Sequence, residues 1–401
     1  MKPTITLPAY PSEIGDWWWK ETCKQWPEHG EERILNLLRQ EIVRQSDRFN
    51  KTRDFDPSAY GARDLSILAY GNFYTPRTFA ACGYTLAEAF GFRQWQAPSK
   101  GPIRILDIGS GSGASSLACL FYLREWGVQN PISLEAWDYS GKSLAFLKRI
   151  HREAIHLWPN TQVVTARKDL RHLENISAKE PYDLILSSYA LNEFWEGREI
   201  DYRKDSISNL IKLLKESGYL LLIEPAEGEV CRSLHGVCSA ALTTHQPFFI
   251  QAPYFNGMTC PLLNSNSRYF SHEVRPCTPP PKVEQINYPL NLEIREVKFG
   301  MSILSKKPSK SASNHYTLLR IVSPIRKRKG TISLWGIGAD GIEREFEWQR
   351  RSVPKEDQNF LLSLQRGDII SCEFRVEQSS SKRTRVSGLD ELRTWFVPRW
   401  R

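Results

Sequence analysis

Three glycines at alternate positions form the motif of this chain with the clearest chemical meaning. Gly109, Gly111 and Gly113 follow an apolar run that begins at Ile105 and precede a helical segment that begins at Ala114. Glycine accepts the positive φ angles of a tight strand-to-helix turn and has no Cβ that would keep a ligand from the backbone. This turn is therefore expected to hold a cofactor.

An aspartate stands at the end of the next predicted strand. Residues 132–138 are mainly apolar and end with Asp138, 25 residues beyond Gly113. A carboxylate at this place can accept hydrogen bonds from both ribose hydroxyls, as the acidic residue of dinucleotide-binding folds does. The chemistry predicted is thus the binding of a nucleoside-containing cofactor.

The pattern D-x-G-x-G-x-G resembles the cofactor loop of class I S-adenosylmethionine-dependent methyltransferases. It differs from the dinucleotide fingerprint G-x-G-x-x-G, whose third glycine would fall at Ala114. The resemblance implies an adenine contact from an acid after the third strand and a loop after the fourth strand that faces the sulfonium. The expected cofactor contacts are Asp107, Gly109, Ser110, Gly111, Gly113, Asp138, Asp169 and Ser188, and the catalytic candidates are Tyr189, Asn192 and Glu193, with no metal ligand.

The loop after the fourth strand, residues 188–193, lacks the N-P-P-Y signature with which many amino-methylating enzymes hold a base nitrogen. Asn192 and Glu193 could orient an acceptor, and they could equally cap the next helix. Because the cofactor supplies the reactive methyl group, little acid–base machinery is required.

Apolar segments that alternate with helical ones must position these residues. After the segments at 105–108 and 132–138, further strands are expected at 163–166, 182–189 and 218–225, with a helix at 205–215 before the last. Alternating strands and helices predict a parallel sheet, and ligands bind outside the carboxyl ends of its strands. The predicted fold is α/β, a Rossmann-like, doubly wound and mostly parallel sheet of the class I methyltransferase type.

Changes in composition divide the chain. We expect a helical N-terminal region, a methyltransferase domain with an irregular insertion rich in Cys and Pro, a Ser/Lys linker, and a basic, β-barrel-like C-terminal domain with a hairpin turn at Asp340-Gly341. The corresponding ranges are 1–100, 101–304 with the insertion at about 226–290, 305–314 and 315–401.

The composition is that of an ordinary globular protein, with 41% hydrophobic and 25% charged residues among 401. No apolar run approaches the ~20 residues of a membrane helix. The N-terminal segment lacks the features of a secretory or mitochondrial signal, so a cytoplasmic location is expected. The eight cysteines show no paired framework and are expected to be reduced.

The net charge of +9 is concentrated at one end of the chain. Residues 315–401 hold 17 Lys and Arg against 11 Asp and Glu, and the linker adds three lysines, so the first 304 residues are formally neutral. Three basic clusters, Arg326–Lys329, Arg350-Arg351 and Lys382–Arg385, are expected on loops of the C-terminal domain. This distribution favours an anionic partner such as nucleic acid, against the alternative of a solvated basic surface.

Several stretches together resemble a narrower family, the methyltransferase-like proteins associated with the mitochondrial small ribosomal subunit and their bacterial relatives. These stretches are LDIGSGSG, LILSSYALNEF, APYFNGMTCPLLNSNSRYFSHEV and RIVSP-IRKRKG-ISLWGIGADG. The resemblance implies that the protein acts on, or binds, small-subunit ribosomal RNA or the assembling subunit. A non-catalytic RNA-binding assembly factor stays open, whereas the basic tail argues against a small-molecule methyltransferase.

Some members of that family hold an iron–sulfur cluster with four cysteines, and this chain keeps one of them. Cys260 is present, but Tyr254 takes the first position, Phe270-Ser271-His272 replaces a WCH-like triplet, and Trp335 stands in the last strand. The remaining cysteines fit no recognised spacing of metal ligands. A family-type cluster is therefore not expected, and aromatic packing is expected in its place.

Overall fold

The computed structural model describes most of the chain. The described residues are 3–47, 61–176, 178–242, 247–255, 257, 259–263, 267, 269–308, 318–371, 383–386 and 392–400, with the backbone alone at 174–175 and 383–386. Among them, no helix is both long and apolar enough to cross a membrane.

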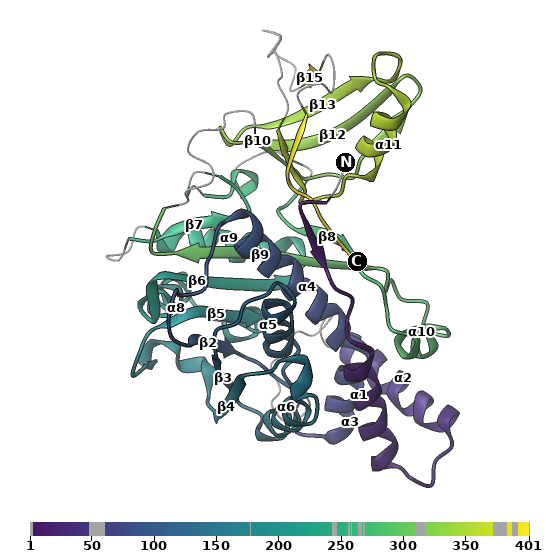
Figure 1. Ribbon diagram of the computed structural model, residues 1–401, viewed down its shortest axis with the longest axis vertical. Coiled ribbons are helices and arrows are strands. Elements are labelled where there is room, and N and C mark those ends of the chain that lie inside the picture. The colour runs from purple at the N-terminus through teal and green to yellow at the C-terminus, as the bar shows by residue number, and fades with distance from the viewer. Residues whose placement is uncertain are drawn as a thin grey trace.

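A mixed eight-stranded sheet forms the centre of the molecule, in the order β4-β3-β2-β5-β6-β9-β7, with β8 also paired to β9 (Figure 1). The first five strands of this order are parallel, and β9, β7 and β8 join antiparallel. This is the α/β class I methyltransferase fold that the sequence predicts. The strands are β2 (Ile103–Ile108), β3 (Ile132–Asp138), β4 (Thr161–Arg167), β5 (Tyr182–Ser188), β6 (Leu214–Pro225), β7 (Phe249–Ala252), β8 (Glu273–Pro276) and β9 (Glu296–Ser305).

Helices cover both faces of the central sheet, because its buried strands are apolar on both sides. Along β2, Ile105 packs into a core with the first set of helices, whereas Leu106 packs with the second set. The first set is α4 (Thr75–Ala87), α5 (Ala114–Glu125) and α6 (Gly141–Glu153), and the second is α7 (Leu191–Phe194), α8 (Ile200–Lys212) and α9 (Gly228–Ala241).

The stretch 226–290 is more regular than the sequence predicts. It contains helix α9, strands β7 and β8, and the short helix α10 (Pro281–Asn287). The prolines there misled the prediction, since most fall between these elements or at the start of α10, where a missing N–H costs nothing, and Pro276 is the last residue of β8. Three-residue helical turns occur at Ile155–Leu157, Pro261–Leu263 and Arg350–Ser352, and a longer one at Leu170–Asn175.

The N-terminal region begins with a strand that pairs with the C-terminus, and its helices then pack against α6 and against the π-helical turn that precedes α4. Its strand β1 (Ile5–Leu7) pairs in parallel with β17 (Pro398–Trp400), so the two ends of the described chain lie side by side (Figure 1). The helices are α1 (Ser12–Gln25), α2 (Glu31–Asp47) and α3 (Asp64–Ala69); α3 runs into α4 through a π-helical turn at Tyr70–Tyr74, and a second such turn, Glu88–Phe92, follows α4.

A second sheet of seven strands lies above the central one in Figure 1. Its pairs follow the open path β15-β13-β12-β10-β14-β16, with β11 on β12, and Asp340-Gly341 forms the predicted turn between β12 and β13. Its elements are β10 (Leu318–Ile321), β11 (Arg326–Arg328), β12 (Thr331–Gly338), β13 (Glu343–Gln349), α11 (Lys355–Ser363), β14 (Ile369–Ser371), β15 (Arg383–Val386) and β16 (Arg393–Phe396).

Two basic clusters predicted on loops lie instead on strands. Arg326–Arg328 form β11, which pairs with β12, and Arg383–Val386 form β15, which pairs with β13. The prediction relied on charge alone, but strands at the edge of a sheet tolerate charged side chains. Lys382 lies outside the described residues.

Buried ion pairs join the two sheets. Arg320 on β10 donates to both carboxylate oxygens of Glu88, at 2.9 Å each, and to Glu273 on β8 at 2.7 Å. Arg275 on β8 then pairs with Asp368, just before β14, at 2.5 Å. All five residues are at most 3% exposed. These ion pairs therefore join the second sheet to β8 of the central sheet and, through Glu88, to the π-helical turn that follows α4.

Candidate active site

At the end of β2 the glycine turn presents backbone atoms that no side chain covers. Gly109, Gly111 and Gly113 have φ angles of 71°, 52° and 93°, in the left-handed region that disfavours other residues. A Cβ at Gly109 would lie 2.4 Å from the Cβ of Ala190, and one at Gly113 would lie 2.3 Å from a methyl of Leu147. Both positions therefore require glycine, and Gly113 serves packing rather than ligand contact.

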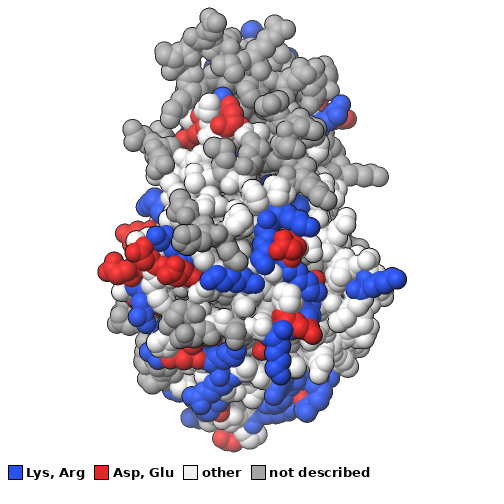
Figure 2. Space-filling model, turned by 90° about the vertical axis from the view of Figure 1, so that its left-hand side faces the viewer, with Lys and Arg blue, Asp and Glu red and all other residues white. Residues whose placement is uncertain are grey.

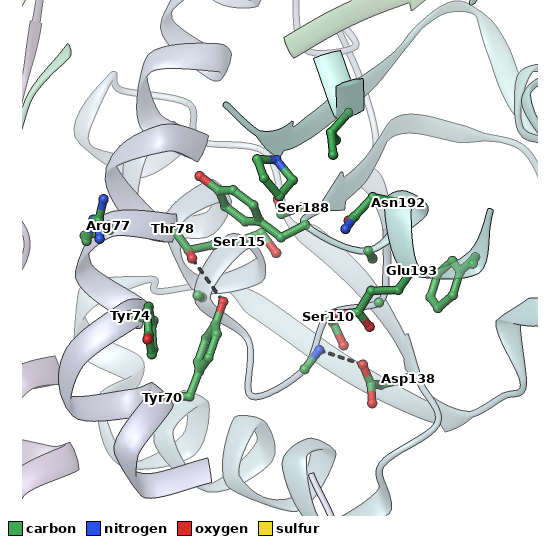
Figure 3. Close-up of a pocket in the computed structure, with 18 of the residues that line it drawn as sticks. Tyr70, Tyr74, Arg77, Thr78, Ser110, Ser115, Asp138, Ser188, Asn192 and Glu193 are labelled. Atoms are coloured by element: carbon green, nitrogen blue, oxygen red, sulfur yellow. Dashed lines mark hydrogen bonds between the residues drawn. The ribbon is translucent and has the colours of Figure 1, made fainter. Parts of the chain in front are cut away.

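Asp138 stands beside this turn at the end of β3 (Figure 3). It accepts hydrogen bonds from the backbone N–H of Gly111 at 2.9 Å and of Ser140 at 2.7 Å. The residue is 5% exposed, and this burial raises the pKa of Asp138 to about 6, although the two hydrogen bonds oppose the shift. Near neutral pH the carboxylate is ionised and can accept further hydrogen bonds from a ligand.

Asp107 lies beneath the turn and away from the cavity. Ser115 and Ser116 at the start of α5 donate hydroxyl hydrogen bonds to it at 2.7 and 2.5 Å. Burial raises the pKa of Asp107 to about 6. The geometry therefore makes Asp107 a residue that fixes the turn against α5, whereas the sequence placed it among the cofactor contacts.

The end of β5 and the short helix α7 form the opposite wall. Ser188 closes β5, and Tyr189 adopts a positive φ of 56°, which turns the chain into α7. Asn192 and Glu193 lie within α7 rather than at its cap and line the cavity. Figure 3 shows Asn192 and Glu193 on one side of the cavity, with Ser188 behind.

Glu224, which the sequence did not single out, holds this wall in place. Its carboxyl group lies at the end of β6 and accepts from the backbone N–H groups of Leu191 at 3.0 Å and Asn192 at 3.4 Å. Its burial, at 1% exposure, raises the pKa of Glu224 to about 8. A buried carboxyl that anchors the start of a helix leaves no local signal, because only the tertiary fold brings β6 to α7.

The π-helical turn and the start of α4 supply the third wall, with Tyr70, Tyr74, Arg77 and Thr78. The hydroxyls of Tyr70 and Thr78 share a hydrogen bond of 3.0 Å. Burial raises the pKa of Tyr70 to about 12 and also raises that of Tyr74, so both phenols stay neutral. The sequence analysis named none of these side chains as contacts, because no motif connects them to the glycine turn.

A cavity of about 340 Å³ lies between the three walls, at the carboxyl ends of the parallel strands. Asp107 and Gly113 do not line it, for the reasons above. Eight of the eleven predicted site residues line it, namely Gly109, Ser110, Gly111, Asp138, Ser188, Tyr189, Asn192 and Glu193.

Asp169 lines a second cavity of about 330 Å³, which shares Tyr139 and Phe194 with the first. Its carboxylate is held by Arg171, whose side chain donates to it at 2.6 to 3.2 Å. Hydrogen bonds from Arg171 lower the pKa of Asp169 to about 2. The structure thus places the predicted adenine contact beside the main cavity, and its role stays a prediction.

Several buried polar atoms of the main cavity are available to bind a ligand. The side-chain oxygens of Ser110, Ser188 and Asn192 are buried and have no hydrogen-bond partner in the described part of the chain. Such atoms are costly unless a ligand or water satisfies them. Together with the bare backbone of the glycine turn and the carboxylate of Asp138, they fit the hydroxyl, amino and carboxylate groups of S-adenosylmethionine.

Comparison with known families gives one match, to "Mitochondrial small ribosomal subunit Rsm22", over residues 64–354. The chain belongs to this family. The match includes all three walls of the cavity and runs into the second sheet, as far as the residues just after β13. The comparison with curated proteins gives no match.

Solved structures similar to this chain include several methyltransferases, all at low TM-scores. A putative S-adenosylmethionine-dependent methyltransferase from Methanococcus maripaludis is 22% identical (TM-score 0.26) and aligns over 41% of this chain and 64% of its own. TrmN from Thermus thermophilus is 18% identical, with a TM-score of 0.31, and aligns over 58% of this chain and 53% of its own. A TehB-like methyltransferase from Corynebacterium glutamicum is 15% identical, with a TM-score of 0.27, and aligns over 67% of this chain and 97% of its own. The aligned part thus spans only about half to two thirds of the first two proteins.

The residues at the family's cluster positions do not suit an iron–sulfur cluster. Tyr254 and Cys260 belong to a small buried core, against which Trp335 packs. Burial raises the pKa of Cys260 to about 11, despite hydrogen bonds from Leu262, Tyr254 and Ser271 that oppose the shift. Iron–sulfur clusters of this type are held by four cysteine thiolates, and the other three positions here hold Tyr254, Ser271 and Trp335. Among the described residues, no three His, Cys, Asp or Glu side chains are grouped closely enough to hold a metal.

We expect protein purified without oxygen to be colourless, because three of the four cluster positions lack cysteine. Iron and sulfide assays should give less than one atom of each per chain. Absorption in the visible range together with stoichiometric iron and sulfide would contradict this expectation. It would show that other cysteines, such as Cys231 and Cys277, assemble a different site.

Proposed function

We propose that this protein is an S-adenosylmethionine-dependent methyltransferase whose acceptor is RNA of the small ribosomal subunit, during assembly of that subunit. The main support is the cavity, where the glycine turn, Asp138 and unsatisfied polar atoms lie together at the carboxyl ends of the strands. Membership of a family named for the small ribosomal subunit supports the choice of acceptor.

In this proposal the side chains bind and align, and the bound cofactor supplies an electrophilic methyl group. Gly109 and Gly111 present backbone to the cofactor, and Asp138 accepts hydrogen bonds from its ribose. Asn192 and Glu193 face the same space and are placed to orient an acceptor by hydrogen bonds. Such alignment lowers the barrier of an in-line displacement without a strong base.

The tyrosines of the N-terminal wall give the cavity an aromatic side. Tyr70 and Tyr74 lie 5.6 Å apart between ring centres, and Tyr189 faces the same space. Neutral aromatic rings can stack on a nucleobase, and stacking tolerates different bases. This feature favours a base as acceptor over a small aliphatic molecule.

Two measurements test the proposal. Calorimetric titration with S-adenosylmethionine asks whether the cavity binds the cofactor, and transfer of labelled methyl groups to assembling small subunits asks whether turnover occurs. Binding together with transfer supports the proposal, with Asp138→Asn as the control in which both should weaken. Binding without transfer would favour the alternative of a non-catalytic, RNA-binding assembly factor. The absence of binding would exclude a cofactor role of the cavity in either function.

The second sheet is expected to provide much of the RNA affinity. Lys327, Arg328 and Lys329 are exposed beside the β11–β12 turn, and the backbone bond from Arg350 to Gly330 brings Arg350-Arg351 to the same place. Replacing Lys327, Arg328 and Lys329 by Ser should lower RNA affinity and flatten its salt dependence by about two to three units of slope.

The same variant keeps Arg326, because this residue donates to the hydroxyl of Tyr269 at 3.0 Å and its loss would disturb packing. Cofactor affinity should stay unchanged and serves as the control for folding. If RNA affinity and its salt slope also stayed unchanged, this basic cluster would be a solvated surface only.

A further inference from the structure

A row of cations follows the amino ends of the strands, at the end of the sheet opposite to the cavity. Arg104 stands at the start of β2, Lys215 at the start of β6 and Lys306 directly after β9. Lys100 precedes β2, Lys179 precedes β5, and Lys307 follows Lys306. We call these six residues, Lys100, Arg104, Lys179, Lys215, Lys306 and Lys307, the amino-edge row.

Contacts between neighbouring strands hold half of this row in place. Lys306 donates to the carbonyl of Leu214 at 2.6 Å, and Lys215 pairs with Asp183 at 2.8 Å. The backbone N–H of Arg104 also binds Asp183, at 2.8 Å. The row is thus continuous across β9, β6, β5 and β2, which at about 4.8 Å per strand spacing makes it roughly 15 Å long.

Positive charge exceeds negative charge along the row. Three carboxylates accompany its six cations, namely Asp183, Glu180 with Arg104, and Glu216 with Lys306. Lys100, Lys179 and Lys307 are exposed and have no ion pair among the described residues. Figure 2 looks at this side of the molecule and shows Lys and Arg gathered over its lower half, with fewer Asp and Glu between them.

We propose that the amino-edge row binds the phosphate backbone of folded RNA. About 15 Å of row matches roughly four phosphates, since one strand of a helix carries a phosphate every ~3.4 Å of axis. Lysines on short loops suit such contact, because phosphate binding positions an RNA without reading its sequence. The proposal rests on the proposed RNA partner, but it does not require methyl transfer.

The surroundings of the row favour RNA over an acidic membrane. The exposed large hydrophobic residues of the described chain are Val43, Ile155, Val164, Ile200, Tyr288, Leu292 and Ile342, and none belongs to the loops that hold the row. A membrane-binding surface normally adds apolar side chains to its basic ones. The row therefore has the positive charge that a membrane-binding surface needs but lacks the exposed apolar side chains among the described residues.

The position of the row limits the size of the partner. Strands of six or seven residues separate the row from the cavity, which is about 20 Å at ~3.3 Å per residue. A mononucleotide in the cavity cannot reach the row. A partner that occupies both must be an RNA of at least several nucleotides, and its binding to the row leaves the cavity accessible.

The test compares two triple variants of the full-length protein. Lys100, Lys179 and Lys307 are replaced by Ser in the first, and the exposed Lys20, Arg33 and Lys148 in the second, which carries the same change of charge at other places. Binding of a hairpin RNA of about 20 base pairs is measured by fluorescence anisotropy between 50 and 200 mM salt. Calorimetric affinity for S-adenosylmethionine reports that each variant is folded.

We expect the first variant to bind this RNA about 10- to 100-fold more weakly at 100 mM salt, with a salt slope lower by about two. The second variant should change affinity less than threefold. Equal losses in both variants would overturn the proposal, because they would reflect net charge and not the row. A second outcome would also overturn it: the wild type binds vesicles with 30% phosphatidylserine, the first variant does not, and the two bind RNA equally well.

Failure of this inference is distinguishable from failure of the proposed function. A protein that transfers no methyl group can still lose RNA affinity in the first variant, which supports the row alone. Conversely, methyl transfer with unchanged RNA affinity in the first variant would retain the proposed function and reject the row.

Discussion

Replacing Arg320 by Met should lower the free energy of unfolding by about 3 to 5 kcal/mol, the largest effect we expect from any single substitution in this chain. Arg320 is 2% exposed and satisfies both oxygens of Glu88 and one of Glu273. Burial lowers the pKa of Arg320, but Glu273 and Glu88 outweigh it and hold the guanidinium charged. Met fills a similar volume and leaves two buried carboxylates short of a partner.

The measurement is urea unfolding followed by tryptophan fluorescence. The exposed Arg351, replaced by Met in the same way, should change stability by less than about 0.5 kcal/mol. Adding Glu88→Gln to Arg320→Met should cost less than the sum of the two single changes, because they remove the same interaction. If the free energy of unfolding of Arg320→Met stayed within 0.5 kcal/mol of the wild type, the attraction of Arg320 to Glu88 and Glu273 would only offset the cost of desolvating these charges.

This ion-pair network also shows what the sequence could not predict. Glu88, Glu273, Arg320 and Asp368 are spread over 280 residues, and no spacing connects them. Charged residues are usually exposed, so each one alone is interpreted as surface. Their burial depends on the docking of the second sheet, which only the tertiary structure contains. The same holds for the parallel pair of β1 and β17 at the two ends of the chain.

The central sheet was predictable because its signals are local. The second strand is observed at Ile132–Asp138, as predicted, and the helix after the glycine turn begins at Ala114 as predicted. Apolar strands buried on both faces and a turn that only glycine can adopt leave a pattern within a few residues. The cavity follows from this pattern, since the strand ends of a parallel sheet converge.

Individual contacts in the cavity were predictable only in part. Asp107 has the right position in the motif but points beneath the turn to Ser115 and Ser116. Glu224 carries no motif, although it anchors the wall that presents Asn192. A motif identifies the backbone that forms a site, whereas the direction of each side chain depends on neighbours from distant segments.

Replacing Asp138 by Asn is expected to weaken the binding of S-adenosylmethionine by about 1.5 to 3 kcal/mol, or roughly tenfold to a hundredfold. The carboxylate already accepts the N–H groups of Gly111 and Ser140 and keeps further lone pairs for the ribose hydroxyls. Asn has nearly the same shape but is a weaker acceptor. Affinity unchanged by calorimetry would remove Asp138 from the cofactor site.

The pH dependence gives this prediction a second, independent readout. Burial raises the pKa of Asp138 to about 6, so the free protein carries a neutral carboxyl below that pH and an ionised one above it. In the proposed site the ionised form accepts hydrogen bonds from the ribose, so wild-type affinity should be constant above about pH 7 and fall towards tenfold per unit below pH 6. Asp107 titrates in the same range but lies outside the cavity, and Asp138→Asn leaves it in place. The variant should therefore bind weakly with a nearly flat profile from pH 5 to 7, and a profile parallel to that of the wild type would assign the titration to Asp107 instead.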